Sequence, residues 1–206
     1  YLTADSDTPL AGNTPLQYGQ KYYVTEHRTS YMNHVTTLGG GLGAGRSDVV
    51  ADGRNNLYIT DGNVIKKYDA ASGTISVYAG TGANGSQDGR ADEATFALPG
   101  GLAIDAAGNL YVADTGNGKI RMIDTEGTVT TIAGAGGQGD QDGPAATALF
   151  NNPYGITRDS KGNLFIADFN NHKIRMIRDG QVTTLAGNGT QNFTDGADTA
   201  ARFRYP

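Results

Sequence analysis

Pro99–Gly134 reads PGGLAIDAAGNLYVADTGNGKIRMIDTEGTVTTIAG, and Pro153–Gly187 repeats it almost at once as PYGITRDSKGNLFIADFNNHKIRMIRDGQVTTLAG. The repeat extends beyond these two copies, because several residue types recur at spacings of 53 or 54 residues. The recurring sets are Asp52, Asp105 and Asp159; Asp61, Asp114 and Asp168; Asp88, Asp142 and Asp195; and Phe96, Phe150 and Phe203. A period that several independent residue types share indicates an architectural repeat.

Each repeat contains four short apolar groups with the alternation that is typical of β-strands. In the first quoted copy these groups are Leu102 and Ile104, Leu110 and Val112, Ile120 and Met122, and Val129 and Ile132. The breaks between them are rich in Gly and Asn, which favour tight turns. A meander of four antiparallel strands cannot bury both faces alone, so neighbouring copies must stack face to face, as in a β-propeller. An open β-solenoid is the competing architecture, but its coils are usually shorter and lack the long connection seen between these copies.

We therefore predict an all-β fold, a β-propeller of four-stranded antiparallel blades. The strands are expected near 46–52, 56–61, 63–69 and 74–79 in blade one, near 101–105, 109–114, 118–124 and 127–133 in blade two, and near 155–159, 163–168, 172–178 and 181–186 in blade three. About a turn and a half of helix is expected at Ala91–Phe96 and again at Pro144–Phe150.

Two segments carry a family likeness. Gly162–Arg175, GNLFIADFNNHKIR, resembles the NHL repeat, and so does Gly108–Arg121; the residues that give the motif its name appear here as Asn171-His172-Lys173. The connection that contains Asp142-Gly143, followed by Ala148, Phe150, Pro153 and Gly155, is similar to that of NHL propellers in secreted and surface bacterial proteins, which are often joined to IPT/TIG domains. The resemblance covers about three quarters of the chain and implies a ring of six blades when complete. Relatives of this fold include amidating lyases, sensor domains, RNA binders and interaction scaffolds, so the fold alone does not set the function.

The blades divide residues 41–206 at regular points. We assign them to 41–80, 81–134 and 135–187, with 188–206 as the linker into a missing blade. Here a linker is the segment between the last strand of one blade and the first strand of the next. Residues 1–40 match the repeat poorly and are expected to form a degenerate blade or the end of a preceding segment. Within them, Gln20–Glu26 aligns with the second strand of blade two, and Val35–Leu38 aligns with its fourth strand.

These residues supply three good blades and at most a fourth, fewer than a closed ring needs. Three explanations fit: the residues are part of a longer chain, two copies complete one ring, or some blades lie outside the residues in hand. We favour the first, because the sequence stops in the middle of a repeat. It follows that the protein is expected to be part of a longer chain or a larger complex.

Composition and charge exclude some classes of function. The formal net charge is −5 and the pI is near 5.0, whereas nucleic-acid binders usually carry a basic face, so no nucleic-acid partner is expected. There is no cysteine and no run of 18 apolar residues, so the sequence predicts no disulfide and no direct membrane insertion. An extracellular or cell-surface location in bacteria is implied by the resemblance alone. The cations at Lys66-Lys67, Lys119/Arg121 and Lys173/Arg175 are expected on solvated strand faces or in links to the adjacent blade.

The repeated aspartates Asp61, Asp114 and Asp168 are expected to hold each blade by accepting backbone N–H bonds from the turn that follows. A cation-binding ring around the channel is the alternative for them. The linker loops Asn84–Gly89 and Gly139–Gly143 alternate oxygen donors and end in Gly, so Asp88, Asp140 and Asp142 are weak candidates for calcium, although the other spaced donors and the closing Glu of an EF-hand are absent. No other cofactor is expected.

No catalytic residue can be assigned. The only histidines are His27, His34 and His172, too few in matched blades for the three protein ligands of a catalytic zinc. The more informative positions are those that depart from the repeat: Tyr154 replaces Gly100, and Phe169-Asn170 replaces Thr115-Gly116. With His172 these residues are candidate ligand-binding residues, although filling the gap to a neighbouring blade is the competing role for the aromatic rings.

The function predicted from these residues is a non-catalytic binding or scaffold module of a secreted or cell-surface bacterial NHL-repeat protein. Its partner would be a protein, or its ligand a glycan or peptide. The alternative is a propeller lyase or hydrolase with a metal-assisted site in the central channel, and on this view some catalytic residues would lie in blades absent here.

Overall fold

The computed structural model describes residues 2–4, 22–24, 42 and 48–206, which belong to two compact units, Tyr1–Gly41 and Leu42–Pro206. In the first unit, β1 (Leu2–Ala4) pairs antiparallel with β2 (Tyr22–Val24). Strand β2 falls within the segment that the sequence aligned with a second blade strand, whereas β1 was not predicted. The aligned segment Val35–Leu38 lies outside the described residues, so the degenerate blade stays a prediction.

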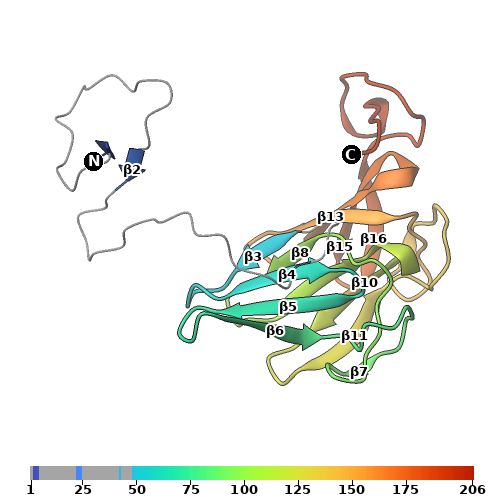
Figure 1. Ribbon diagram of the computed structural model, residues 1–206. Helices are drawn as coiled ribbons and strands as arrows, with labels where there is room; N and C mark the ends of the chain where they lie inside the picture. Colours follow the sequence, from blue (N-terminus) through green and yellow to red (C-terminus); the bar gives the residue numbers. More distant parts are fainter. Residues whose placement is uncertain (1, 5–21, 25–41, 43–47) are drawn as a thin grey trace. The chain divides into compact units, whose positions relative to one another are not determined.

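The second unit contains the three predicted blades, each an antiparallel sheet (Figure 1). Blade one consists of β3 (Val49–Ala51), β4 (Leu57–Asp61), β5 (Val64–Asp69) and β6 (Thr74–Ala79). Blade two contains β8 (Leu102–Ile104), β9 (Leu110–Asp114), β10 (Lys119–Ile123) and β11 (Thr128–Ala133). Blade three contains β13 (Pro153–Arg158), β14 (Leu164–Asp168), β15 (Lys173–Arg178) and β16 (Gln181–Ala186). The all-β fold of NHL-type blades is thereby confirmed.

Blades two and three each have a fifth strand that the sequence did not predict. The linker strands β7 (Gly89–Arg90) and β12 (Gly143–Pro144) pair with β11 and β16 and extend each sheet at its outer edge. The expected helices after them are wrong, because each is a single turn, closed by the bond from Ala94 N–H to the carbonyl of Arg90 and by its counterpart from Ala148 to Pro144. Short 3-10 helices instead occupy η1 (Thr115–Asn117), η2 (Phe169–Asn171) and η3 (Asp198–Ala200).

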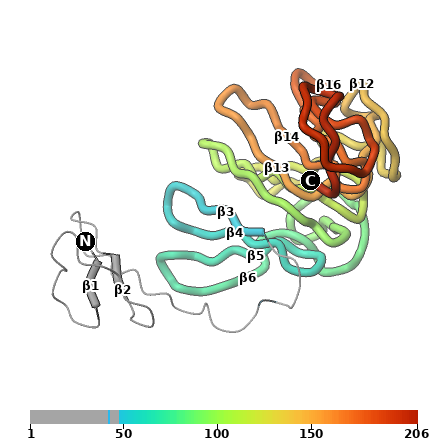
Figure 2. The backbone as a smooth tube through the Cα atoms, turned by 90° about the horizontal axis from the view of Figure 1, so that it is seen from above, coloured from blue at the N-terminus to red at the C-terminus, as the bar shows by residue number. Residues whose placement is uncertain are grey.

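The three sheets lie side by side in chain order, with their first strands, β3, β8 and β13, next to one another (Figures 1 and 2). Two hydrogen bonds join the blades along these strands. The N–H of Gly101 donates to the carbonyl of Tyr154 at 2.8 Å, and the N–H of Leu102 donates to a carboxylate oxygen of Asp48 at 2.8 Å. One bond between backbone groups and one from a backbone N–H to a side-chain carboxylate thus hold neighbouring blades together on the inner side of the unit, where a propeller has its axis.

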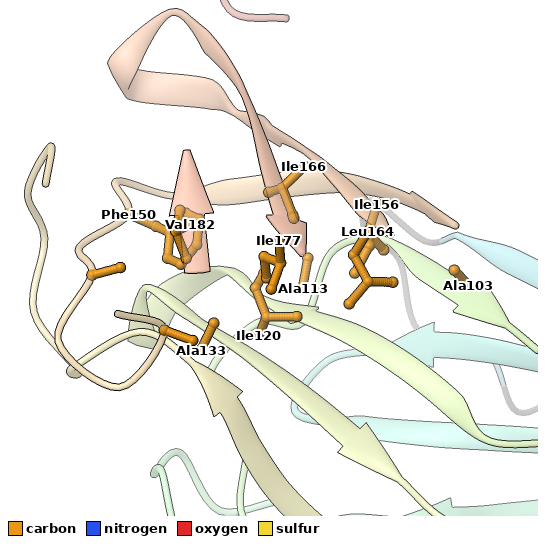
Figure 3. Close-up of a cluster of buried hydrophobic side chains, with 12 residues drawn as sticks. Ala103, Ala113, Ile120, Ala133, Phe150, Ile156, Leu164, Ile166, Ile177 and Val182 are labelled. Atoms are coloured by element: carbon orange, nitrogen blue, oxygen red, sulfur yellow. The ribbon is translucent and has the colours of Figure 1, made fainter. Parts of the chain in front are cut away.

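Each gap between blades is filled by its own apolar cluster. Between blades two and three, small residues of blade two such as Ala113 and Ala133 face larger ones of blade three, including Phe150 and Ile166 (Figure 3). Between blades one and two, Ile65 and Tyr58 meet Phe96, Leu110 and Val112. Both Phe96 and Phe150 come from the linkers and are fully buried, so each linker contributes to the core as well as joining two blades.

The close approach at Gly101 yields a testable prediction. A β-carbon at this position would lie 2.4 Å from the carbonyl oxygen of Tyr154, so Gly101→Ala must push the inner strands of blades two and three apart. We expect the free energy of unfolding to fall by about 1–3 kcal/mol, the usual cost of overpacking. Gly53→Ala is the matched control, because nothing lies within 4 Å of its added carbon. Equilibrium denaturation of both variants checks this, and equal stabilities would contradict the close packing.

Candidate ligand-binding site

The loops between the second and third strands of blades two and three lie beside the linkers. In blade two the side-chain amide of Asn117 donates to the carbonyl of Gly85 at 2.7 Å. In blade three Asn171 makes the same bond to Gly139, also at 2.7 Å. Loop and linker are therefore one connected surface, which we call the linker face.

Beneath this face, the buried residues Asp114 and Arg121 and the exposed Asp88 form a network that ties the linker to its blade. We call this network the brace. Arg121 NH1 donates to Asp114 at 2.8 Å, and Arg121 Nε donates to Asp88 at 2.9 Å. Asp114 also accepts the N–H of Ala97 at 2.8 Å, and Asp88 accepts the N–H of Thr131 on β11 at 3.0 Å. The expectation of a solvated arginine is therefore wrong, since Arg121 is 0% exposed.

The same brace recurs in blade three, where Arg175 pairs with Asp168 at 2.7 Å and with Asp142. In blade one Lys66 occupies the position of Arg121 and lies 2.6 Å from Asp61. The structural role predicted for the repeated aspartates is confirmed for Asp114 and Asp168, with one change: the backbone N–H that each accepts comes from the linker and not from the following turn.

Burial raises the pKa of Asp114 above its usual value, while the bonds from Ala97, Asn117 and Arg121 act in the opposite direction. Asp168 shows the same raised pKa for the same reason. Burial alone would favour a neutral carboxyl group, so the positive charge of the arginine is what makes a buried carboxylate tolerable here. By contrast, the pKa of the half-exposed Asp142 is lowered, because the bonds from Thr184 and Arg175 outweigh its burial.

The three aspartates proposed for calcium have protein partners. Asp88 and Asp142 belong to the braces, and Asp140 pairs with Lys173 at 2.6 Å. Within residues 48–206 and the other described positions, no three His, Asp or Glu side chains are grouped so as to hold a metal ion. The oxygens that calcium would need are used here to fix the linkers.

Three of the four candidate ligand-binding residues lie in one aromatic cluster on the linker face. The ring of Phe169 lies 6.2 Å from that of Tyr154 and stacks on Tyr205 at 4.9 Å. His172 packs edge-on against Tyr205 at 4.8 Å, and its Nδ1 accepts the N–H of Tyr205. Asn170 lies beside them but bonds to Asn151 through both its backbone N–H and its side chain.

The cluster combines packing with exposure. Tyr154 lies against blade two, because a β-carbon on Gly100 would meet its ring at 2.9 Å, so this ring does fill a gap between blades. His172 is buried, whereas Tyr205 is 44% exposed. Sequence reasoning missed Tyr205, although its spacing was a signal: Leu98 and Asn152 occupy the equivalent positions of the two preceding linkers, and Tyr205 is the aromatic residue of the three. In the structure all three residues have positive φ.

Comparison with known proteins supports this fold and its repeats. Residues 77–144 match the model of the Teneurin NHL domain, and residues 150–175 match that of the NHL repeat. The resemblance to NHL-repeat proteins is thereby confirmed. It is 32% identical over 166 residues to human NHL repeat-containing protein 2, covering 73% of this chain and 23% of that protein.

Among solved structures, a Bacteroides thetaiotaomicron protein is 26% identical with a TM-score of 0.63, covering 77% of this chain and 40% of that one. An auxiliary nutrient binding protein from the same organism is 28% identical with a TM-score of 0.53, covering 63% and 35%. The NHL blades here thus span less than half the length of the relatives they match. None of the described helices is long and apolar enough to span a membrane.

The brace generates a prediction about Arg121→Met. This variant would leave Asp114 buried without its cation, so we expect the free energy of unfolding at pH 7 to fall by about 3–5 kcal/mol. The loss should shrink as the pH falls towards the ordinary aspartate pKa of 3.8, because Asp114 then binds a proton in the folded state before the unfolded chain does. Denaturation curves at several pH values measure this.

The matched control is Arg90→Met, which removes an exposed arginine paired with Asp92 in the same linker. Exposed pairs contribute little, so its stability should stay close to that of the parent protein at every pH. Equal losses for Arg121→Met and Arg90→Met would contradict the stabilising role of the brace.

Proposed function

We propose that these NHL blades form a non-catalytic binding module of a secreted or cell-surface bacterial protein, and that the aromatic cluster on the linker face contacts its peptide, glycan or protein partner. The observation that carries this proposal is the cluster of Phe169, Tyr205 and Tyr154. Aromatic rings with a polar edge are well suited to binding, because they bury a large area at a small cost in conformational entropy.

The polar groups of the blades support binding over catalysis. The repeated carboxylates Asp114 and Asp168 are buried and each is bonded to an arginine, a backbone N–H and an asparagine. A general acid or base must reach its substrate. Groups held in this way stabilise the blade, and a lyase or hydrolase would need other residues in its channel.

The relatives support the same class of function. One solved structure with NHL-type blades is described as an auxiliary nutrient binding protein from a Bacteroides species. A second, from Bacteroides ovatus, carries the same description at 25% identity and a TM-score of 0.56. The bacterial surface location that we propose rests on the family resemblance.

The test uses substitutions taken from the repeat itself. In Phe169→Thr/Tyr205→Asn, each aromatic residue is replaced by the residue at the equivalent position of the preceding blade, Thr115 or Asn152. We expect at least a tenfold loss of binding on glycan and peptide arrays, with no change in thermal stability beyond a few degrees. Val77→Thr, which changes an exposed side chain on β6, is the control and should bind as the parent does.

Two results would contradict the proposal. One is unchanged binding by the folded double variant, which would place the partner elsewhere. The other is chemical turnover of a bound glycan or peptide, which would make the protein an enzyme.

A further inference from the structure

A second candidate site lies at the opposite end of the blades. A cavity of about 960 Å³ opens between blades one and two, lined by the β3–β4 and β8–β9 loops and by Thr125 in the β10–β11 loop. In an antiparallel meander these loops lie at the other end of the strands from the β4–β5 and β9–β10 loops, which belong to the linker face. The cavity is large enough for a short oligosaccharide.

The first gap, between blades one and two, contains this cavity, and the second gap lies between blades two and three. Several residues of the cavity differ from their equivalents in the second gap. The strand registers align Lys67 with Met122, and Tyr78 with Ile132. On the facing strand, Ile104 in the first gap stands where Arg158 stands in the second. The guanidinium carbon of Arg158 lies 5.8 Å from the centroid of the Tyr111 ring, so an arginine occupies the second gap. The first gap has the shorter Ile104 at this position, and the polar side chains of Lys67 and Tyr78 line the opposite wall.

The cavity presents hydrogen-bond donors. The Arg54 guanidinium and the Tyr78 hydroxyl have no hydrogen-bond partner among the described residues. The Lys67 ammonium lies 3.6 Å from Asp69, and its charge also helps to lower the pKa of Asp52. Burial raises the pKa of Tyr78 above its usual value, so its hydroxyl stays protonated and can donate. Tyr58 packs edge-on against Tyr78, with the ring centroids 4.9 Å apart.

The two carboxylates in the cavity wall are already engaged. Asp52 accepts the N–H groups of Arg54 and Asn56 and the side-chain amide of Asn56. Asp105 accepts three backbone N–H groups as well as the side chains of Asn109 and Tyr111. The pKa values of Asp52 and Asp105 are both lowered, so these groups remain carboxylates and the wall carries both signs of charge. Their oxygens accept bonds from the loops, so the donors that can meet a ligand directly are Arg54, Lys67 and the Tyr78 phenol.

We propose that this cavity binds a saccharide that carries carboxylates, such as an oligomer of uronic acid. The carboxylate would pair with Lys67 and Arg54, while the sugar ring packs beside Tyr58 and Tyr78. This site is separate from the aromatic cluster of the proposed function and lies at the other end of the blades. The protein as a whole carries a net charge of −5, and Asp52 and Asp105 offset the two cations within the cavity. Recognition of an anion therefore has to come from direct contact with Lys67 and Arg54 and not from long-range attraction.

The experiment is titration calorimetry with trigalacturonate and with its methyl-esterified form, which keeps the rings but loses the negative charges. We expect the acid to bind, its affinity to fall as salt is raised, and the ester to bind at least tenfold more weakly. Equal affinity for the two sugars, or no binding of the acid at millimolar concentration, would overturn the proposal.

Three variants introduce residues that the second gap already uses, Lys67→Met, Tyr78→Ile and Ile104→Arg. The first two should weaken binding of the acid at least tenfold, and Ile104→Arg should abolish it by filling the cavity. Ile104 and Tyr78 pack partly against the core of blades one and two, whereas Lys67 is not part of that core and its side chain is 27% exposed. Lys67→Met is therefore the variant that should disturb folding least. Arg90→Met is the matched control and should bind as the parent does.

A folded Lys67→Met variant that binds the acid with parental affinity would also overturn the proposal. The Phe169→Thr/Tyr205→Asn variant separates this site from the proposed function, because it leaves the cavity intact. Loss of array binding in that variant with unchanged trigalacturonate affinity would support both sites. Unchanged array binding would contradict only the aromatic cluster, and absence of trigalacturonate binding by the parent protein would contradict only the cavity.

Discussion

The charge network of Asp88, Asp114 and Arg121 is the interaction on which the blade depends. One guanidinium reaches the linker through Asp88 and the second strand through Asp114, and it also donates to the carbonyls of Gln87 and Thr95. It lies 5.2 Å from the ring centroid of Phe96, which the linker delivers to the core. A lysine could not make all these contacts, because it lacks the planar fork of donors. The fully buried guanidinium of Arg121 therefore fixes the conformation of the linker against the blade.

This brace also decides where binding can occur. Each blade engages its own repeated carboxylates, so the residues with the strongest periodic signal are structural. The two surfaces that we propose for recognition are those where equivalent positions differ, Phe169 against Thr115 on the linker face and Ile104 against Arg158 in the opposite cavity. In both proposals the repeated residues stabilise the blades, and the residues that depart from the repeat contact the ligand.

The strands were predictable because their turns and alternation repeat three times, and each repeat confirmed the others. The role of Arg121 could not be predicted in the same way, because a cation on a short strand is usually solvated. The signal lay in the spacing: Asp88, Asp114 and Arg121 all recur 54 residues later, as Asp142, Asp168 and Arg175. Charges of opposite sign that share one period are candidates for a buried pair.

The cavity between blades one and two could not have been found in this way. Its volume depends on which side chain of one blade faces which side chain of the next. That pairing follows from how β3 and β4 of blade one pack against β8 of blade two. Ile104 alone is an ordinary strand residue. It becomes informative only when the structure shows that Arg158 occupies the equivalent position between blades two and three. The backbone is the same in both gaps, but the second gap contains an arginine side chain, whereas the first is an open cavity lined by hydrogen-bond donors. Such exchanges leave the braces of blades two and three in place, so a repeat protein can acquire a binding site through a few substitutions between two blades.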